Sequence, residues 1–244
     1  MARSGRRKKT AKGGRRAAPA AGPWRRLRRW LGRAVLAVAA LFALSLLAYR
    51  FVTPPVTIYM AQETRRLGEV AHVPVPMARI APVMARAAVA AEDADFCLHW
   101  GFDMSAIRDA IAEGAGRGAS TISQQVVKNV WLWHGRSWPR KALEAAVTPL
   151  MEAAWPKRRV LEVYLNIAEF DAGVFGVEAA ARHYFGVPAA DLSAVQAARL
   201  AAVLPDPKGR SASRPTAALR ARAAAIMDGA ATIARDGRAA CFED

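Results

Sequence analysis

The stretch AEDADFCLHWGFD, residues 91–103, places Glu92 and Asp93 directly after the apolar run APVMARAAVAA. Pro82 suits the first turn of a helix, so this run predicts a helix over residues 82–91 that ends at the two acids. The helix dipole is negative at that end and Asp93 is adjacent, and both effects raise the pKa of the Glu92 carboxyl. Such a carboxylate is a good general base near neutral pH. The equal alternative is a solvated helix end with two ordinary acids.

A second segment, GASTISQQVVKN (residues 118–129), leads from a glycine-rich turn into a predicted helix. Thr121 and Gln124 have the spacing of a capping box. Unpaired backbone N–H groups at such a helix start bind phosphate, and Gln124 and Lys128 share one helix face. An ordinary helix start with a solvated basic face is the alternative. The basic residues near this segment are Arg117, Lys128, Arg136, Arg140 and Lys141.

A third segment, RKALE (residues 140–144), places Arg140 and Lys141 four and three residues before Glu144. All three can lie on one helix face. One interpretation is a surface ion pair that contributes under about 1 kcal/mol. The other is a second active-site carboxylate that two cations hold ionised. Glu92 would then have a raised pKa, while Glu144 would be held in its ionised form. Two carboxyl groups perturbed in opposite directions are typical of sugar-transfer chemistry.

The amino-terminal part of the chain predicts a membrane anchor. Residues 1–33 contain thirteen Lys and Arg and no acid, so most of the net charge of +16 lies there. The uncharged run Ala34–Tyr49 follows, bracketed by Arg33 and Arg50, and it reaches bilayer length if residues 34–52 are included. A cleaved signal peptide and a nucleic-acid-binding arm are the weaker alternatives. The excess of positive charge places the arm in the cytoplasm and the remaining chain on the other side of the membrane.

The remaining chain is predicted to be mainly helical, because alternating strand patterns are scarce. Pro149 is expected to bend the helix that contains it. Cys97 and Cys241 are too few for a disulfide framework. One pair could form in an oxidising compartment, but nothing in the sequence places the two residues together, and we expect free thiols. The four His residues lack zinc-ligand spacing. The further helices are predicted over residues 102–113, 121–133, 141–154, 156–165, 193–204 and 216–234. Ser193 and Gln196 have capping-box spacing at the start of the helix over residues 193–204.

Five segments, taken together, resemble the conserved motifs of glycosyltransferase family 51, the peptidoglycan glycosyltransferases that polymerise lipid II. The motifs occur in the family's order, and the fixed positions are present except for conservative changes such as Ser123 for Thr. The segments are EDADFCLHWGFD (92–103), GASTISQQVVKN (118–129), RKALE (140–144), KRRVLEVYLN (157–166) and GVFGVEAAARHYFG (173–186).

The resemblance implies a lysozyme-like, mainly α-helical fold with a small membrane-dipping jaw lobe, preceded by one transmembrane helix. No room remains for a transpeptidase domain, so the similarity is to the monofunctional members. The expected organisation is a basic cytoplasmic tail, a transmembrane helix, a linker and the glycosyltransferase domain, at residues 1–33, 34–52, 53–69 and 70–240.

The resemblance also implies residue roles. Glu92 matches the general base, which would deprotonate the 4-hydroxyl of the acceptor sugar. Glu144 matches the second essential glutamate, which is expected to orient cations or a divalent metal. The positions that match or accompany the donor-site residues are Ser120, Gln124, Lys128, Arg136, Arg140 and Lys141.

The implied reaction joins lipid II to a growing lipid-linked glycan chain with a β-1,4 bond and releases undecaprenyl pyrophosphate. No cofactor is certain, and Mg²⁺ or Mn²⁺ near the pyrophosphate is an open alternative. The implied setting is the inner membrane, with the catalytic domain in the periplasm, and with division or elongation proteins but no nucleic acid as partners. A membrane-anchored muramidase-like hydrolase is the main alternative function, and a catalytically inactive scaffold is a weaker one.

Overall fold

The computed structural model describes residues 23–114, 120–135 and 137–243. Arg117 and Arg136, which belong to the predicted basic cluster, therefore lie outside the described residues. The chain divides into two compact units, residues 1–44 and 45–244.

The first unit consists, where it is described, of most of helix α1 (Pro23–Tyr49). An 18-residue window of this helix has a mean hydropathy of 2.2, and none of it is buried. Length, composition and exposure fit a single-pass membrane anchor, as the sequence predicts. The helix begins earlier than the uncharged run and includes the arginines that precede it.

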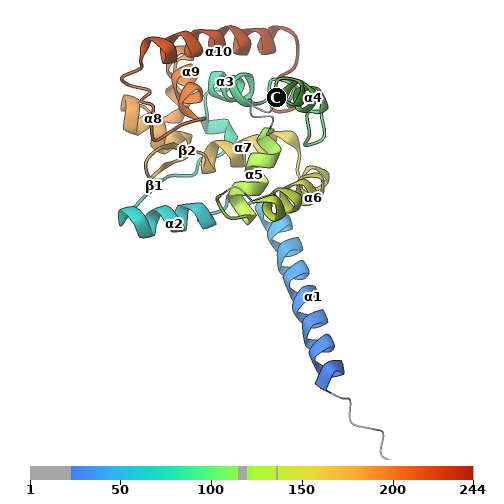
Figure 1. The fold of residues 1–244 in the computed structure, drawn as a ribbon. Coiled ribbons are helices and arrows are strands. Elements are labelled where there is room, and N and C mark those ends of the chain that lie inside the picture. The colour runs from blue at the N-terminus through green and yellow to red at the C-terminus, as the bar shows by residue number, and fades with distance from the viewer. Residues whose placement is uncertain (1–22, 115–119, 136, 244) are drawn as a thin grey trace, which may run out of the picture. The chain divides into compact units, whose positions relative to one another are not determined.

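The second unit is mainly helical, as Figure 1 shows. Helix α5 packs against α6 and α7, while α3, α9 and α10 pack on one another. The helices of the described part of this unit are α2 (Ile58–Leu67), α3 (Pro82–Glu92), α4 (Met104–Ala112), α5 (Ile122–Trp131), α6 (Trp138–Ala154), α7 (Lys157–Ile167), α8 (Val177–Phe185), α9 (Ala194–Val203) and α10 (Ala217–Arg235).

A small sheet completes the second unit, with strand order β1-β3-β2. Strand β1 (Ala71–His72) runs parallel to β3 (Val174–Phe175), and β2 (Glu169–Asp171) runs antiparallel to β3. Two 3₁₀ turns, Met77–Arg79 and Ala189–Asp191, are the remaining regular elements of the described residues.

Small residues bring α10 close to α3, the helix that ends in Glu92. A Cβ atom at Gly229 of α10 would lie only 3.2 Å from the Cβ of Ala90 on α3. Ala87 and Ala88 of α3 and Ala223 of α10 are buried in the same core. Because such short side chains leave little space between the two helices, α10 is held firmly beside the carboxyl end of α3.

The predicted capping boxes are confirmed. Thr121 and Gln124 exchange side-chain and backbone hydrogen bonds at the start of α5, and Ser193 and Gln196 do the same at the start of α9. Helix α6 runs without interruption through Pro149, and the bend expected there stays a prediction. The carbonyl group that loses its partner there belongs to the exposed Ala145, so water can hydrogen-bond to it.

The expectation of free thiols is wrong, because Cys97 and Cys241 form a disulfide with their Cα atoms 5.6 Å apart. The two residues are 144 positions apart in the chain, a separation from which sequence reasoning could not infer contact. Phe242, next to the disulfide, is buried with its ring centroid 6.4 Å from that of Phe96. Arg238 Nη1 also donates to the carbonyl oxygen of Ala94 (3.2 Å). The carboxyl-terminal segment is thus fastened to the loop that follows Glu92.

Replacing both cysteines by alanine is expected to lower the free energy of unfolding by about 2–5 kcal/mol, because the bridge restricts the unfolded chain. Urea denaturation of the detergent-solubilised protein, with and without reductant, measures the change. Reductant should destabilise the wild type and leave the double variant unaffected. An identical midpoint for the wild type in both conditions would show that the disulfide does not stabilise the fold.

Candidate active site

Glu92 lies at the end of α3 and lines a cavity of about 500 Å³. Gln125 Nε2 of α5 donates a hydrogen bond to Glu92 Oε2 (2.9 Å). Burial raises the pKa of the Glu92 carboxyl, while the Gln125 hydrogen bond and the positive charges of Arg222 and Lys128 partly oppose this. The raised pKa of Glu92 agrees with the sequence prediction, but its main cause is desolvation by burial. The charge of Asp93 contributes least of the named causes.

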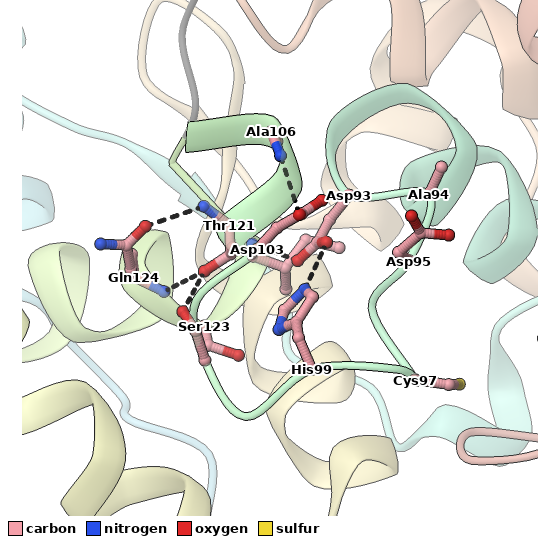
Figure 2. Close-up of polar contacts among 12 residues, drawn as sticks. Asp93, Ala94, Asp95, Cys97, His99, Asp103, Ala106, Thr121, Ser123 and Gln124 are labelled. Carbon is pink, nitrogen blue, oxygen red and sulfur yellow. Dashed lines mark hydrogen bonds and ion pairs between the residues drawn. The ribbon is translucent and has the colours of Figure 1, made fainter. Parts of the chain in front are cut away.

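Asp93 differs from Glu92 in its partners, which belong to the surrounding loop and backbone. His99 Nε2 donates to Asp93 Oδ1 (2.7 Å), and the backbone N–H of Ile122 donates to Oδ2 (2.9 Å). Figure 2 shows the contact between Asp93 and His99. One buried carboxylate therefore joins the end of α3, the loop that follows it and the start of α5.

The start of α5 is fixed by a second set of hydrogen bonds, several of which are drawn in Figure 2. Thr121 Oγ1 donates to the carbonyl oxygen of Gly101 (2.7 Å), and Gln124 Oε1 accepts from the backbone N–H of Thr121 (3.1 Å). Gly101 has φ +82°, and a Cβ atom there would lie 2.5 Å from Thr148 Cγ2, so only glycine fits this approach to α6. Gln124, expected in the donor pocket, is buried in the helix cap, while Gln125 contacts Glu92.

The predicted cluster on α6 is present around a buried carboxylate. Arg140 Nη1 lies 2.7 Å from Glu144 Oε2, and Lys141 Nζ is paired with Glu144 Oε1. Glu144 is only 2% exposed, which excludes the interpretation as a simple surface ion pair. Lys141 Nζ also donates to Ser120 Oγ (3.2 Å), so the cluster reaches the residue that precedes the α5 cap.

Lys128 connects the two carboxylates electrostatically. Burial lowers the pKa of its amine, and the positive charges of Arg140 and Lys141 lower it further. The negative charges of Glu144 and Glu92 act on it in the opposite direction. Five of the predicted residues are therefore brought together in one electrostatic group: Glu92, Lys128, Arg140, Lys141 and Glu144. Arg136 lies outside the described residues.

The residues around Glu144 do not fit the divalent cation that the resemblance leaves open. Each carboxylate oxygen of Glu144 is paired with a cationic side chain. Mg²⁺ and Mn²⁺ prefer carboxylate and carbonyl oxygens, and the described residues contain no cluster of three or more His, Cys, Asp or Glu side chains. The positive charge at this position comes from lysine and arginine.

Two residues that sequence reasoning missed also line the cavity. Gln125 directly follows Gln124, and helix periodicity from the predicted cap could have placed it on a different face from its neighbour. Arg222 comes from α10, 130 positions after Glu92 and outside every motif, so the sequence gives no signal for it.

The transglycosylase family profile matches residues 60–231. A protein described as biosynthetic peptidoglycan transglycosylase from Jannaschia sp. (strain CCS1) is 64% identical over 216 residues, covering 88% of this chain and 90% of the relative. A relative of the same description from Rhodospirillum centenum is 50% identical over 217 residues, covering 86% and 94%. One from Yersinia pestis (strain Pestoides F) is 50% identical over 192 residues, covering 73% and 79%.

Glu92→Gln is expected to stabilise the fold at pH 8, because it removes a carboxylate whose ionisation burial disfavours. The folded-state pKa of Glu92 is raised, so the wild type loses stability as pH rises through that value. The glutamine variant does not titrate at this position. Its advantage in melting temperature over the wild type should therefore grow between pH 4.5 and pH 8. A difference that is the same at both values would contradict a raised pKa.

Proposed function

The chain belongs to the transglycosylase family, and from this premise we propose that Glu92 is the general base of its peptidoglycan glycosyltransferase reaction. The protein is an enzyme of cell-wall synthesis whose substrates are lipid II and the growing glycan chain. The observation that supports the role of Glu92 is its position in the wall of a cavity and close to partly buried cations.

The acceptor hydroxyl would lie in the cavity within hydrogen-bond reach of Glu92. As the oxygen attacks the anomeric carbon of the donor, Glu92 takes the hydroxyl proton and the bond from that carbon to the phosphate oxygen breaks. The attack comes from the side opposite the leaving group, so the configuration inverts to the β linkage. The hydrogen bond from Gln125 Nε2 holds the Glu92 carboxylate in place for this transfer.

The leaving group is a pyrophosphate, and its developing negative charge requires preorganised cations. Lys128, Arg140 and Lys141 supply them, and Glu144 fixes the last two through its ion pairs. In this proposal Glu144 is a positioning residue. Arg136, Ser120 and Gln124 retain the donor-site roles that the resemblance implies as predictions, although the side chain of Gln124 is engaged in the helix cap.

Hydrolysis is not favoured as the function. A hydrolase with paired carboxylates places water against a neutral sugar leaving group and has no anion of this size to stabilise. Here the second carboxylate, Glu144, is buried and fully engaged by two cations, so it is not available to activate water.

The location of the catalytic domain follows from two independent features. Helix α1 fits a single-pass anchor with its arginines at the amino-terminal end, which favours a cytoplasmic amino terminus. The disulfide between Cys97 and Cys241 favours an oxidising compartment for the catalytic domain, such as the periplasm. We therefore place the anchor in the inner membrane. Division or elongation proteins stay a prediction as partners.

Exposed apolar side chains gather on the loop and helix that follow Glu92. Leu98, Trp100, Met104 and Ile111 are each more than half exposed. In water such a group is unfavourable, whereas the bilayer interface accepts it. We assign these residues to the membrane-dipping small lobe that the family resemblance implies.

Glu92→Gln is expected to lower the turnover of lipid II by a factor on the order of 10² or more, because general base catalysis is lost. Binding of lipid II should persist, since the amide keeps the shape of the side chain. Polymerisation of labelled lipid II, with the products resolved by size, measures the change. Glu113→Gln, an exposed acid at the end of α4, is the matched control and should retain activity. Unchanged polymerisation by Glu92→Gln would refute the assignment of the base.

A reporter fused after Asp244 tests the proposed topology. Alkaline phosphatase, which is active only outside the cytoplasm, should be active in this fusion, and a cytoplasm-only fluorescent protein should be dark. The opposite pattern would overturn the periplasmic placement of the catalytic domain.

A further inference from the structure

Arg222 lines the cavity but is not one of the donor-site residues described above. It projects from α10 and lines the same cavity as Glu92. Its Nε atom is buried and has no hydrogen-bond partner among the described residues. The other charged residues of the described cavity lining are all carboxylates: Glu92, Asp93, Asp103 and Asp109.

The buried Nε–H group of Arg222 has no acceptor within the described chain, an arrangement that is rare in folded proteins. Arg222 is held in this position because it lies on a helix that is packed against the core. Leu219, Ala223 and Ile226 of the same helix are buried, and Gly229 brings α10 into close contact with Ala90. The fold thus holds the Arg222 guanidinium at the wall of the cavity that contains Glu92, and its remaining N–H groups can donate to a ligand oxygen there.

The remaining groups of the cavity indicate what kind of ligand carries this oxygen. Asp93 is engaged by His99 and the Ile122 amide, and Asp103 caps α4 by accepting from Ala106 N (2.9 Å). The carboxylates of Glu92 and Asp109 then face the open space together with Arg222. Carboxylates accept hydrogen bonds from sugar hydroxyls, while a guanidinium donates to a hydroxyl or acetamido oxygen. A free anion would instead meet a lining with more negative than positive groups.

We propose that Arg222 is a substrate-binding residue whose guanidinium donates to an oxygen of the N-acetylated sugar whose hydroxyl approaches Glu92. The inference rests on the proposed role of Glu92 as the base. It assigns the acceptor side of the site to α10, whereas the donor pyrophosphate side is built from α5 and α6.

Arg222 has a second effect on the same reaction. A sugar in the cavity displaces water and makes ionised Glu92 still less favourable, and the positive charge of Arg222 opposes this. Losing that charge should therefore raise the pKa of Glu92 and move the acidic limb of kcat/KM to higher pH. The titratable and charged groups that face Glu92 or its cavity are Asp93 at the end of α3, Asp103 and Asp109 of the α4 segment, Lys128 of α5, Tyr164 of α7 and Arg222 of α10.

The test compares Arg222→Gln and Arg222→Lys with Arg220→Gln in the full-length protein with lipid II as substrate. Arg220 lies on the same helix but is exposed, and its side chain bonds only to the carbonyl oxygen of Pro215 in the described structure. Arg222→Gln should raise KM at least tenfold and move the acidic limb of kcat/KM upward in pH. Arg222→Lys should raise KM but leave the acidic limb in place, because the charge remains. Arg220→Gln should match the wild type.

An unchanged KM in both Arg222 variants, or an equal loss in Arg220→Gln, would overturn the inference. The comparison of Arg222→Lys with Arg222→Gln separates a substrate contact from a folding role, because a folding defect does not displace a pH limb. Thermal melting of each variant checks that the protein is folded under the conditions of the kinetic assay. Wild type and Glu92→Gln in the same assay separate this inference from the proposed function. If Glu92→Gln is inactive and Arg222→Gln is fully active, only the role of Arg222 fails.

Discussion

The carboxylate of Asp93 is the contact on which the arrangement of the active site depends. It accepts from His99 on the loop after α3 and from the Ile122 amide at the start of α5. These three segments meet at one buried side chain, next to the residue Glu92 that lines the cavity. The two adjacent acids therefore have separate tasks. Asp93 fixes the backbone, and Glu92 is left for chemistry, with Gln125 as its one hydrogen-bond partner in the described structure.

The surroundings of Glu92 combine two opposing requirements of a general base. Burial makes its proton affinity high enough to accept a proton, while nearby cations keep it from holding that proton permanently. Lys128, one of these cations, also belongs to the group that we propose to stabilise the leaving diphosphate. In the proposed mechanism Lys128 both lowers the pKa of the base and stabilises the leaving group, an arrangement that suits the joining of sugars to a lipid-linked chain.

Local patterns made much of the fold predictable. The capping residues Thr121 and Ser193 mark the starts of α5 and α9, and Pro82 marks the start of α3. The family resemblance identified Glu92 and the pair of cations around Glu144, and the structure brings these residues together. Features that depend on tertiary contact were not predictable. Cys97 and Cys241 meet through the packing of the chain end, Arg222 enters the site through the packing of α10 on α3, and burial rather than Asp93 dominates the pKa of Glu92.

The central claim is that the Glu92 carboxyl holds its proton more tightly than an ordinary glutamate while it faces the cavity. A ¹³C NMR titration of the protein labelled at glutamate side-chain carboxyls, with the Glu92 signal assigned by its loss in Glu92→Gln, measures this directly. The account predicts a midpoint above the ordinary value of about 4.3. A midpoint at or below that value would contradict it, because the carboxyl would then be too weak a base for the role proposed here.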